Sequence, residues 1–226
     1  METLRSLMFV PGHRPRMIEK AFALGMEAAV FDLEDSVPPS EMDAARALVA
    51  AAVRRAPGRP LRFVRVNANG TGRLGADVRA VVGPGLDGLV LPKVQGPEDV
   101  LAVEAFGGPC EADVGLRPGS VRLLATVESA MGLLSAPAIA ACSPRLVGLM
   151  FGTEDFGLDL GMFAVRGDGG RELGWARSLL VLAVASRHLQ AVDGVHVDLQ
   201  EPDGLRAEAR RARRPGSTGK PLIHPS

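Results

Sequence analysis

The sequence has 226 residues, of which 46% are hydrophobic and 23% are charged, so it can form one large domain with a buried core. Its 26 basic residues equal its 26 acidic residues, which leaves no long-range field that would favour nucleic acid or an anionic membrane. No apolar run approaches the roughly 20 residues that span a bilayer. No secretory signal precedes the first expected strand, and the two cysteines lack metal-ligand spacing. We therefore expect a cytoplasmic protein with free thiols.

Short apolar segments alternate along the chain with helical patterns. We expect strands at residues 6–10, 28–33, 61–66, 88–91, 121–127, 146–151, 191–197 and 219–223. We expect helices at residues 14–24, 40–55, 76–82, from 97 onward, and at 135–142, 172–188 and 202–214. The glycine-containing stretches 107–119 and 157–170 are expected to be loops.

This regular alternation indicates an α/β fold with a parallel sheet covered by helices. Eight near-equal units in 226 residues predict a TIM (β/α)8 barrel that occupies residues 1–226 as a single domain. An open, doubly wound sheet is the alternative. The equal spacing of the units and the lack of a GxGxxG motif argue against it.

Polar residues gather where the expected strands end. Glu128 follows the fifth strand, and Glu154 and Asp155 follow the sixth, so neighbouring parallel strands each deliver a carboxylate at the same edge. A barrel collects such residues on one face. The alternative is that Glu154 and Asp155 open a surface loop and cap the next helix. The other residues at strand ends are Glu34, Asp35, Arg65, Asn67, Lys93, Asp193 and His224.

Carboxylates with one or two cations, and without a Cys or His pair, suit a hard divalent ion. Mg²⁺ prefers oxygen ligands and is commonly held by one or two protein carboxylates, and we select Glu128 and Asp155 for that role. Arg65 is the candidate for binding a substrate carboxylate, because the planar guanidinium can bond both oxygens. The alternative for Arg65 is a structural ion pair with Glu34 or Asp35.

Short motifs along the full length of the chain carry a resemblance to a known family. They are RSLMFVPG at 5–12, DLEDSVP at 32–38, RVN at 65–67, LPK at 91–93, Glu128, FGTED at 151–155 and IHP at 223–225. In this order they resemble the HpcH/HpaI aldolase and citrate lyase family, which includes citrate lyase beta subunits, malyl-CoA lyases and other CoA-ester lyases. The resemblance implies a TIM barrel that makes or breaks a carbon–carbon bond next to an acyl-CoA thioester.

The resemblance also implies roles for particular residues. Arg65 would bind the carboxylate of a 2-oxo acid, and Glu128 and Asp155 would hold Mg²⁺, with Glu128 also facing the substrate. Glu34 and Asp35 would complete the network of water and hydrogen bonds around the metal.

Retro-aldol or retro-Claisen cleavage expels an enolate, and a divalent ion can polarise the oxygen from which the new carbonyl forms. Backbone N–H groups near Gly152–Asp155 are expected to help stabilise the oxyanion, and Gly152 and Thr153 are expected to bind substrate.

The leading interpretation is a Mg²⁺-dependent lyase that cleaves a 3-hydroxyacyl-CoA, of citryl-CoA or malyl-CoA type, to an acyl-CoA and a 2-oxo acid. A CoA-independent class II aldolase acting on 2-oxo-4-hydroxy acids is a second possibility. The third is a non-catalytic family member that serves as a binding or assembly subunit.

The end of the sequence carries a separate expectation. By resemblance, family members continue past the His-Pro turn into an eighth helix and an extension, which in several relatives closes over a neighbouring subunit. This sequence stops at Ser226 without them. We therefore expect uncovered apolar surface near the first and eighth strands, slow turnover, and association with a partner. The resemblance indicates a homo-oligomer, a trimer or hexamer.

Overall fold

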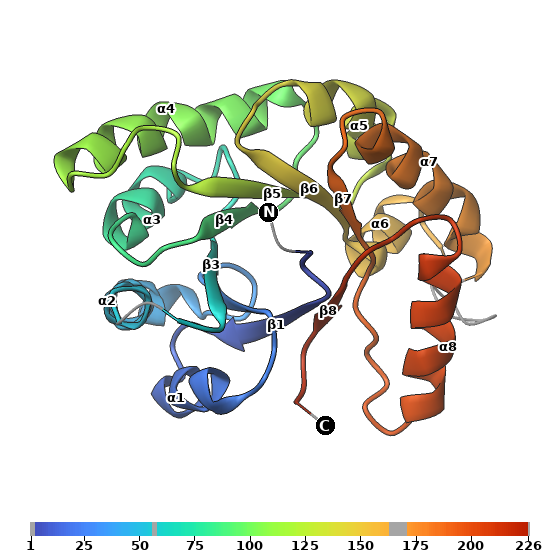
Figure 1. Cartoon of the computed structure of the whole chain (residues 1–226), viewed down its shortest axis with the longest axis horizontal. Coiled ribbons are helices and arrows are strands. Elements are labelled where there is room, and N and C mark those ends of the chain that lie inside the picture. The colour runs from blue at the N-terminus through green and yellow to red at the C-terminus, as the bar shows by residue number, and fades with distance from the viewer. Residues whose placement is uncertain (1–2, 56–57, 163–170, 226) are drawn as a thin grey trace.

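Eight parallel strands form a nearly closed barrel in the computed structural model, which describes residues 3–55, 58–162 and 171–225 (Figure 1). The strands pair in the order β7-β6-β5-β4-β3-β2-β1-β8. A bridge between Val192 and Gly219 joins the two end strands, and the N–H of Asp193 donates to the carbonyl of Gly219 at 2.9 Å. The predicted TIM-type barrel is therefore confirmed. Its strands are β1 Ser6–Pro11, β2 Ala28–Asp32, β3 Leu61–Arg65, β4 Gly88–Leu91, β5 Arg122–Val127, β6 Leu146–Phe151, β7 Gln190–Val192 and β8 Lys220–Leu222.

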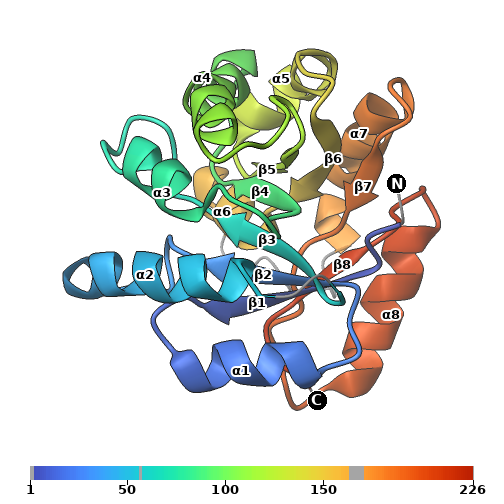
Figure 2. The same ribbon diagram turned by 60° about the vertical axis from the view of Figure 1, so that its left-hand side comes forward.

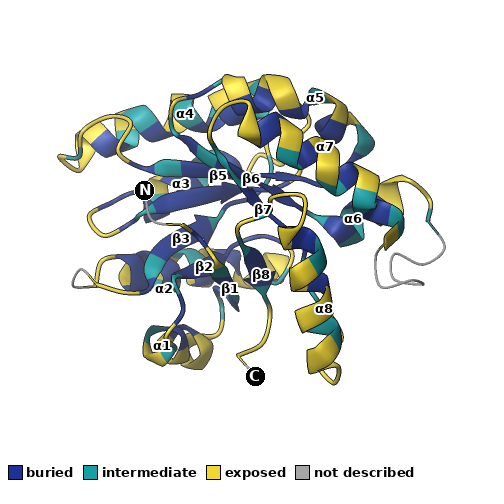
Figure 3. Ribbon diagram, turned by 45° about the vertical axis from the view of Figure 1, so that its right-hand side comes forward, coloured by how far each residue is buried: buried dark blue, intermediate teal, exposed yellow. Residues whose placement is uncertain are grey.

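The helices surround the strands in both ribbon views (Figures 1 and 2). Strands are buried and the outward faces of helices are exposed, as Figure 3 shows. In the described ranges, no helix combines the length and apolar character needed to cross a bilayer. The helices are α1 Pro15–Ala23, α2 Met42–Val53, α3 Leu74–Val81, α4 Pro97–Asp113, α5 Ala130–Ala141, α6 Thr153–Asp159, α7 Gly174–Ala185 and α8 Pro202–Arg213, with the 3₁₀ turns η1 Pro39–Glu41 and η2 Arg171–Leu173.

Alternation of side chains along each strand divides the core into two layers. One set fills the barrel interior and includes Val30, Phe63, Leu124 and Met150. The neighbouring residues point outward and pack under the helices in a second cluster. Because the period is two, residues two and four positions beyond an interior residue also face inward. The carboxyl ends of the strands therefore bring selected polar side chains above the apolar interior.

The prediction of a loop at 107–119 was wrong for residues 107–113, because α4 continues through Gly107, Gly108 and Pro109 to Asp113, and right for residues 114–119. The last turn of this helix is held by Glu111, which is fully buried. Its carboxylate accepts the N–H of Gly119 and the N–H of Val121, both at 2.7 Å, and pairs with Arg145. Tertiary contacts thus outweigh the low helix propensity of the Gly-Gly-Pro sequence.

The expected loop from residue 157 was also wrong at its start, because α6 begins at Thr153 and ends at Asp159. Residues 163–170 of that expected loop lie outside the described residues. Helix α5 begins at Ala130, earlier than expected, because the Ser129 hydroxyl accepts the N–H of Gly132 at 3.1 Å. Strand β7 ends at Val192 and is shorter than expected, and η2 occupies the start of the segment in which one long helix was expected.

Candidate active site

A cavity of about 370 Å³ lies at the carboxyl ends of the strands. A larger cavity, about 750 Å³, lies at the opposite end, where Thr3, Glu27 and Arg59 precede the first strands. The smaller cavity contains most of the predicted site residues, and it occupies the end of the barrel at which this fold places its reactive groups. Its lining comprises Phe9, Val10, Pro11, Asp32, Ser36, Arg65, Thr126, Glu128, Met150, Phe151, Gly152, Thr153, Glu154, Asp155, Val195, Pro221 and Ile223.

Asp32 and Arg65 form a bidentate ion pair at the edge of this cavity. They end β2 and β3 and are register partners, so the ladder sets them side by side. Arg65 Nε donates to Asp32 Oδ1 at 2.6 Å, and Nη2 donates to Oδ2 at 2.7 Å. Burial of Asp32 raises its pKa, but Arg65, together with hydrogen bonds from Ser36 and Glu34, outweighs this effect and lowers the pKa overall. The Arg65 guanidinium also lies 5.2 Å from the centre of the Phe9 ring.

Arg65 is shared with a second carboxylate. Its Nη1 lies 2.9 Å from Glu34 Oε2, an ion-pair distance without hydrogen-bond alignment, and 3.9 Å from Asp35 Oδ2. The structural ion pair considered for Arg65 is therefore present, with Asp32 as its closest partner. A guanidinium has five N–H groups, and Asp32 takes two of them. The N–H groups that Asp32 does not take are on Nη1 and Nη2, and Glu34 Oε2 lies at ion-pair distance from Nη1.

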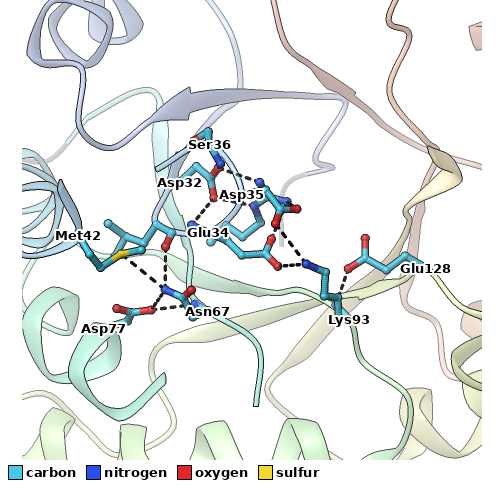
Figure 4. A network of polar contacts seen from close by, with 11 residues as sticks. Asp32, Glu34, Asp35, Ser36, Met42, Asn67, Asp77, Lys93 and Glu128 are labelled. Atoms are coloured by element: carbon cyan, nitrogen blue, oxygen red, sulfur yellow. Dashed lines mark hydrogen bonds and ion pairs between the residues drawn. The ribbon is translucent and has the colours of Figure 1, made fainter. Parts of the chain in front are cut away.

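Lys93 links the carboxylates that follow β2 with the carboxylate that follows β5 (Figure 4). Its Nζ lies 2.7 Å from Glu34 and 3.2 Å from Asp35, and its backbone N–H donates to Glu128 Oε1 at 2.5 Å. The backbone of Lys93 has a φ of 54°, which is uncommon for a residue with a side chain. This left-handed conformation lets one residue contact Glu128 through its backbone and Glu34 through its side chain.

Glu128 is a buried carboxylate without a side-chain cation among its hydrogen-bond partners in the described chain. Burial raises its pKa to about 8; the N–H of Lys93 opposes the shift, whereas the negative charges of Asp155 and Glu34 add to it. A Cβ atom at Gly152 would lie 2.5 Å from Glu128 Cβ, so glycine at that position makes room for the carboxylate. Two acids that repel each other in a cavity provide a site for a cation.

The donor set fits Mg²⁺ held by two protein carboxylates and water. Glu128 and Asp155 line the same cavity, and both offer the hard oxygen ligands that this ion prefers. Within residues 3–55, 58–162 and 171–225, no group of three or more His, Cys, Asp or Glu side chains is arranged as a metal cage. An ion held by these two carboxylates would keep several water ligands, as Mg²⁺ usually does.

Helix α6 positions the other predicted residues. Gly152 precedes this helix, Thr153 begins it, and Asp155 lies in its first turn. The N–H of Gly152 donates to the carbonyl of Val127 at 2.9 Å. That N–H is therefore not free to stabilise an oxyanion, which corrects one part of the sequence-based expectation.

Three residues expected at the strand ends have other surroundings. Asn67 is buried and bonds the carbonyl of Leu33 and the carboxylate of Asp77, both at 2.7 Å. Asp193 faces the helices, where Arg177 and Lys220 bind it at 2.7 and 2.9 Å. His224 is exposed and is not among the residues that line the cavity.

Asp32 lines the cavity but was given no role in the sequence analysis. It lies inside an expected strand, and its spacing of two from Glu34 was the signal that both face the barrel interior. Thr126 has the same spacing from Glu128 and was also not singled out.

The fold and the cavity define a (β/α)8 barrel with a carboxylate-rich mouth that contains one arginine and one lysine. The chain belongs to the HpcH/HpaI aldolase/citrate lyase family, whose sequence model matches residues 5–225.

Individual relatives agree with this assignment. The chain is 38% identical over 224 residues to citrate lyase subunit beta of Escherichia coli K12, covering 99% of this chain and 74% of the relative. It is 40% identical over 223 residues to a (3S)-malyl-CoA thioesterase of Cereibacter sphaeroides, covering 98% and 73%. The citrate lyase beta subunit of Mycobacterium tuberculosis, solved with oxaloacetate and magnesium, superposes with a TM-score of 0.79 at 31% identity, covering 99% and 92%.

Proposed function

We propose that this chain is a Mg²⁺-dependent carbon–carbon lyase that cleaves a 3-hydroxyacyl-CoA of citryl-CoA or malyl-CoA type to an acyl-CoA and a 2-oxo acid. The observation that carries the proposal is that Arg65, Glu128 and Asp155 line one cavity. A 2-oxo acid can be held by a guanidinium that binds its carboxylate and by a metal ion bound to two protein carboxylates. The relatives named for citrate lyase and for malyl-CoA support the substrate class.

Glu128 and Asp155 are the residues that we assign to Mg²⁺. When bound, this ion supplies Lewis-acid polarisation of the substrate oxygen that becomes a carbonyl. The oxaloacetate and magnesium present in the structure of the Mycobacterium relative support this assignment.

Arg65 binds the carboxylate of the 2-oxo acid through N–H groups that Asp32 does not take, while Asp32 fixes the plane of the guanidinium. Glu34 and Asp35, held by Lys93, order the hydrogen bonds on the neighbouring side of the mouth. The N–H of Lys93 orients Glu128 toward the same space. These contacts pre-position the reacting groups, which is a large part of catalytic power.

Thioester hydrolysis is a second candidate, because the Cereibacter relative at 40% identity is named for that reaction. Product analysis separates the alternatives. Malyl-CoA or citryl-CoA is incubated with and without Mg²⁺, and the CoA species and acids are separated by chromatography.

A lyase gives acetyl-CoA together with glyoxylate or oxaloacetate, whereas a thioesterase gives free CoA and malate or citrate. Cleavage of a 4-hydroxy-2-oxo acid without CoA would instead support a class II aldolase. Mg²⁺-dependent binding of oxaloacetate without turnover of any of these substrates would support a non-catalytic binding subunit and contradict the proposed activity.

A further inference from the structure

Thr126 places a hydroxyl group in the wall of the cavity below Glu128. It lies on β5 between Leu124, which packs in the barrel interior, and Glu128, and alternation gives all three the inward direction. The rise of a strand puts the Cα atoms of Thr126 and Glu128 roughly 6.6 Å apart. The hydroxyl is therefore about one pleat deeper than the carboxylate.

The hydroxyl of Thr126 is unpaired. The side chain is 4% exposed, and its Oγ1 has no hydrogen-bond partner in the part of the chain that the structure describes. Buried hydroxyl groups in proteins are nearly always bonded, so an exception that lines a cavity indicates a bond made by a ligand.

Met150, the register partner of Thr126 on β6, lines the same cavity with an apolar side chain. Ser36 also lines the cavity with an unpaired Oγ, but it belongs to the loop after β2 and is less buried than Thr126. Thr126 therefore contributes a hydroxyl that a strand holds beside the apolar side chain of Met150.

We propose that Thr126 is a specificity-determining residue, whose hydroxyl donates a hydrogen bond to a polar group at the end of the ligand distant from its 2-oxo-acid carboxylate, because β4 separates the strand of Thr126 from the strand of Arg65. This inference rests on the proposed function. A site built to bond a polar group rejects an analogue without that group more strongly than an apolar pocket does. The residue would thus favour a second carboxylate, as in oxaloacetate, over an alkyl end.

The test uses two probes of matched shape. Oxaloacetate carries a terminal carboxylate, and 4-methyl-2-oxopentanoate carries an isopropyl group in its place. Calorimetric titration of each probe, with Mg²⁺ present, gives the affinity ratio for the parent, for Thr126→Val, which keeps the shape but removes the hydroxyl, and for Thr126→Ser, which keeps the hydroxyl.

We expect Thr126→Val to reduce the preference for oxaloacetate about 10-fold and Thr126→Ser to retain it. Without ligand, Thr126→Val should unfold at the same or a higher temperature than the parent, because no hydrogen bond of the free protein is lost. If the Thr126 hydroxyl instead stabilised the free protein, Thr126→Val would unfold at a lower temperature than the parent.

An unchanged affinity ratio in Thr126→Val overturns the proposal while leaving the 2-oxo-acid site in place. Thr126→Ala provides the same comparison of ratios if the valine variant does not fold. Failure of the parent itself to bind either probe with Mg²⁺ would overturn the proposed function as well, so the two failures are distinguishable.

Discussion

Asp32 accepts two parallel N–H groups of Arg65, at 2.6 Å and 2.7 Å, and is thereby the closest partner of the cation at the mouth of the barrel. The same carboxylate accepts the N–H of Glu34 at 2.9 Å and the N–H of Ser36 at 3.1 Å. One buried residue therefore fixes both the plane of the guanidinium and the loop that carries Glu34. This makes Asp32 a positioning residue for Arg65.

Replacement of this carboxylate should separate positioning from metal binding. We expect Asp32→Asn to weaken oxaloacetate binding at least ~10-fold, because Arg65 loses its bidentate partner. Mg²⁺ binding in the absence of oxaloacetate should change little, because Asp32 is not one of the proposed ligands. Calorimetric titration of each ligand measures both effects, and a parallel loss of Mg²⁺ and oxaloacetate binding would contradict the positioning role.

Asp203→Asn is the matched control for that variant. Asp203 also pairs with an arginine, Arg206 at 2.8 Å, but its side chain is 91% exposed. An exposed pair contributes about 0–1 kcal/mol. The control should therefore bind oxaloacetate like the parent and unfold at nearly the same temperature.

Arg65→Lys tests whether oxaloacetate binding requires the planar guanidinium of arginine. Lysine keeps the positive charge but offers a point charge in place of parallel N–H groups. We expect the affinity for oxaloacetate to fall at least ~10-fold, consistent with about 1.5–3 kcal/mol for a hydrogen bond to a charged group. If this variant binds oxaloacetate or glyoxylate as tightly as the parent does, Arg65 serves the ion pair with Asp32 alone.

The strands and the carboxylates that follow them could be predicted from the sequence, because apolar runs that end at acids are local patterns. Asp32 could not be assigned by that rule, since it lies within its strand and acts through the neighbouring register partner Arg65. Asp193 was misplaced for a related reason. It follows Val192, which faces the interior, so alternation turns Asp193 outward, where it meets Arg177 and Lys220, which is 27 residues distant.

The predicted helix boundaries were wrong where contacts with residues distant in the sequence determine the end or the start of a helix. Glycine and proline predicted a loop at 107–119, yet Glu111 ties the end of α4 to the loop before β5. The helix expected at 135–142 begins earlier, at Ala130, and includes Gly132. A Cβ there would lie 2.4 Å from the carbonyl of Val94, so this glycine is required by close packing and does not mark a helix end.

Replacement of either proposed metal ligand should reduce the affinity for Mg²⁺. Glu128→Gln and Asp155→Asn should each weaken Mg²⁺ binding, because each removes one of two negatively charged oxygen ligands. Folding should persist, since the repulsion between the two acids is relieved. Titration of Mg²⁺ in the presence of oxaloacetate measures the affinity, with Asp203→Asn as the unaffected variant. Parent-like affinity in both site variants would remove these residues from the metal site.

Gly152→Ala should disturb Glu128 without changing any polar group. A Cβ at this position would lie 2.5 Å from both Glu128 Cβ and Oε2, a separation that forces the glutamate to move. We expect weaker Mg²⁺ binding and a turnover number at least ~10-fold lower, because a displacement of about 1 Å can cost that much or more. Gly174→Ala, whose Cβ would meet nothing within 4 Å, is the control. Parent-like kinetics in Gly152→Ala would show that Glu128 has room to adjust.

The ion pairs of Asp193 with Arg177 and Lys220 should make the free energy of unfolding depend on pH in acid. Burial of Asp193 raises its pKa, but Lys220 and Arg177 outweigh that effect and lower the pKa overall; Lys220 also pairs with Glu208 at 3.2 Å, and His196 lies 3.1 Å from the same glutamate. A depressed folded-state pKa contributes stability that is present above the unfolded value of about 3.9 and is lost as the pH falls through the folded pKa.

Asp193→Asn should therefore lower the free energy of unfolding at pH 7 by about 3–5 kcal/mol, the typical cost of breaking a buried pair. Urea unfolding between pH 7 and pH 3 should show a shallower decline for this variant than for the parent and for Asp203→Asn. Parallel curves for all three proteins would show that the Asp193 pair does not govern acid stability.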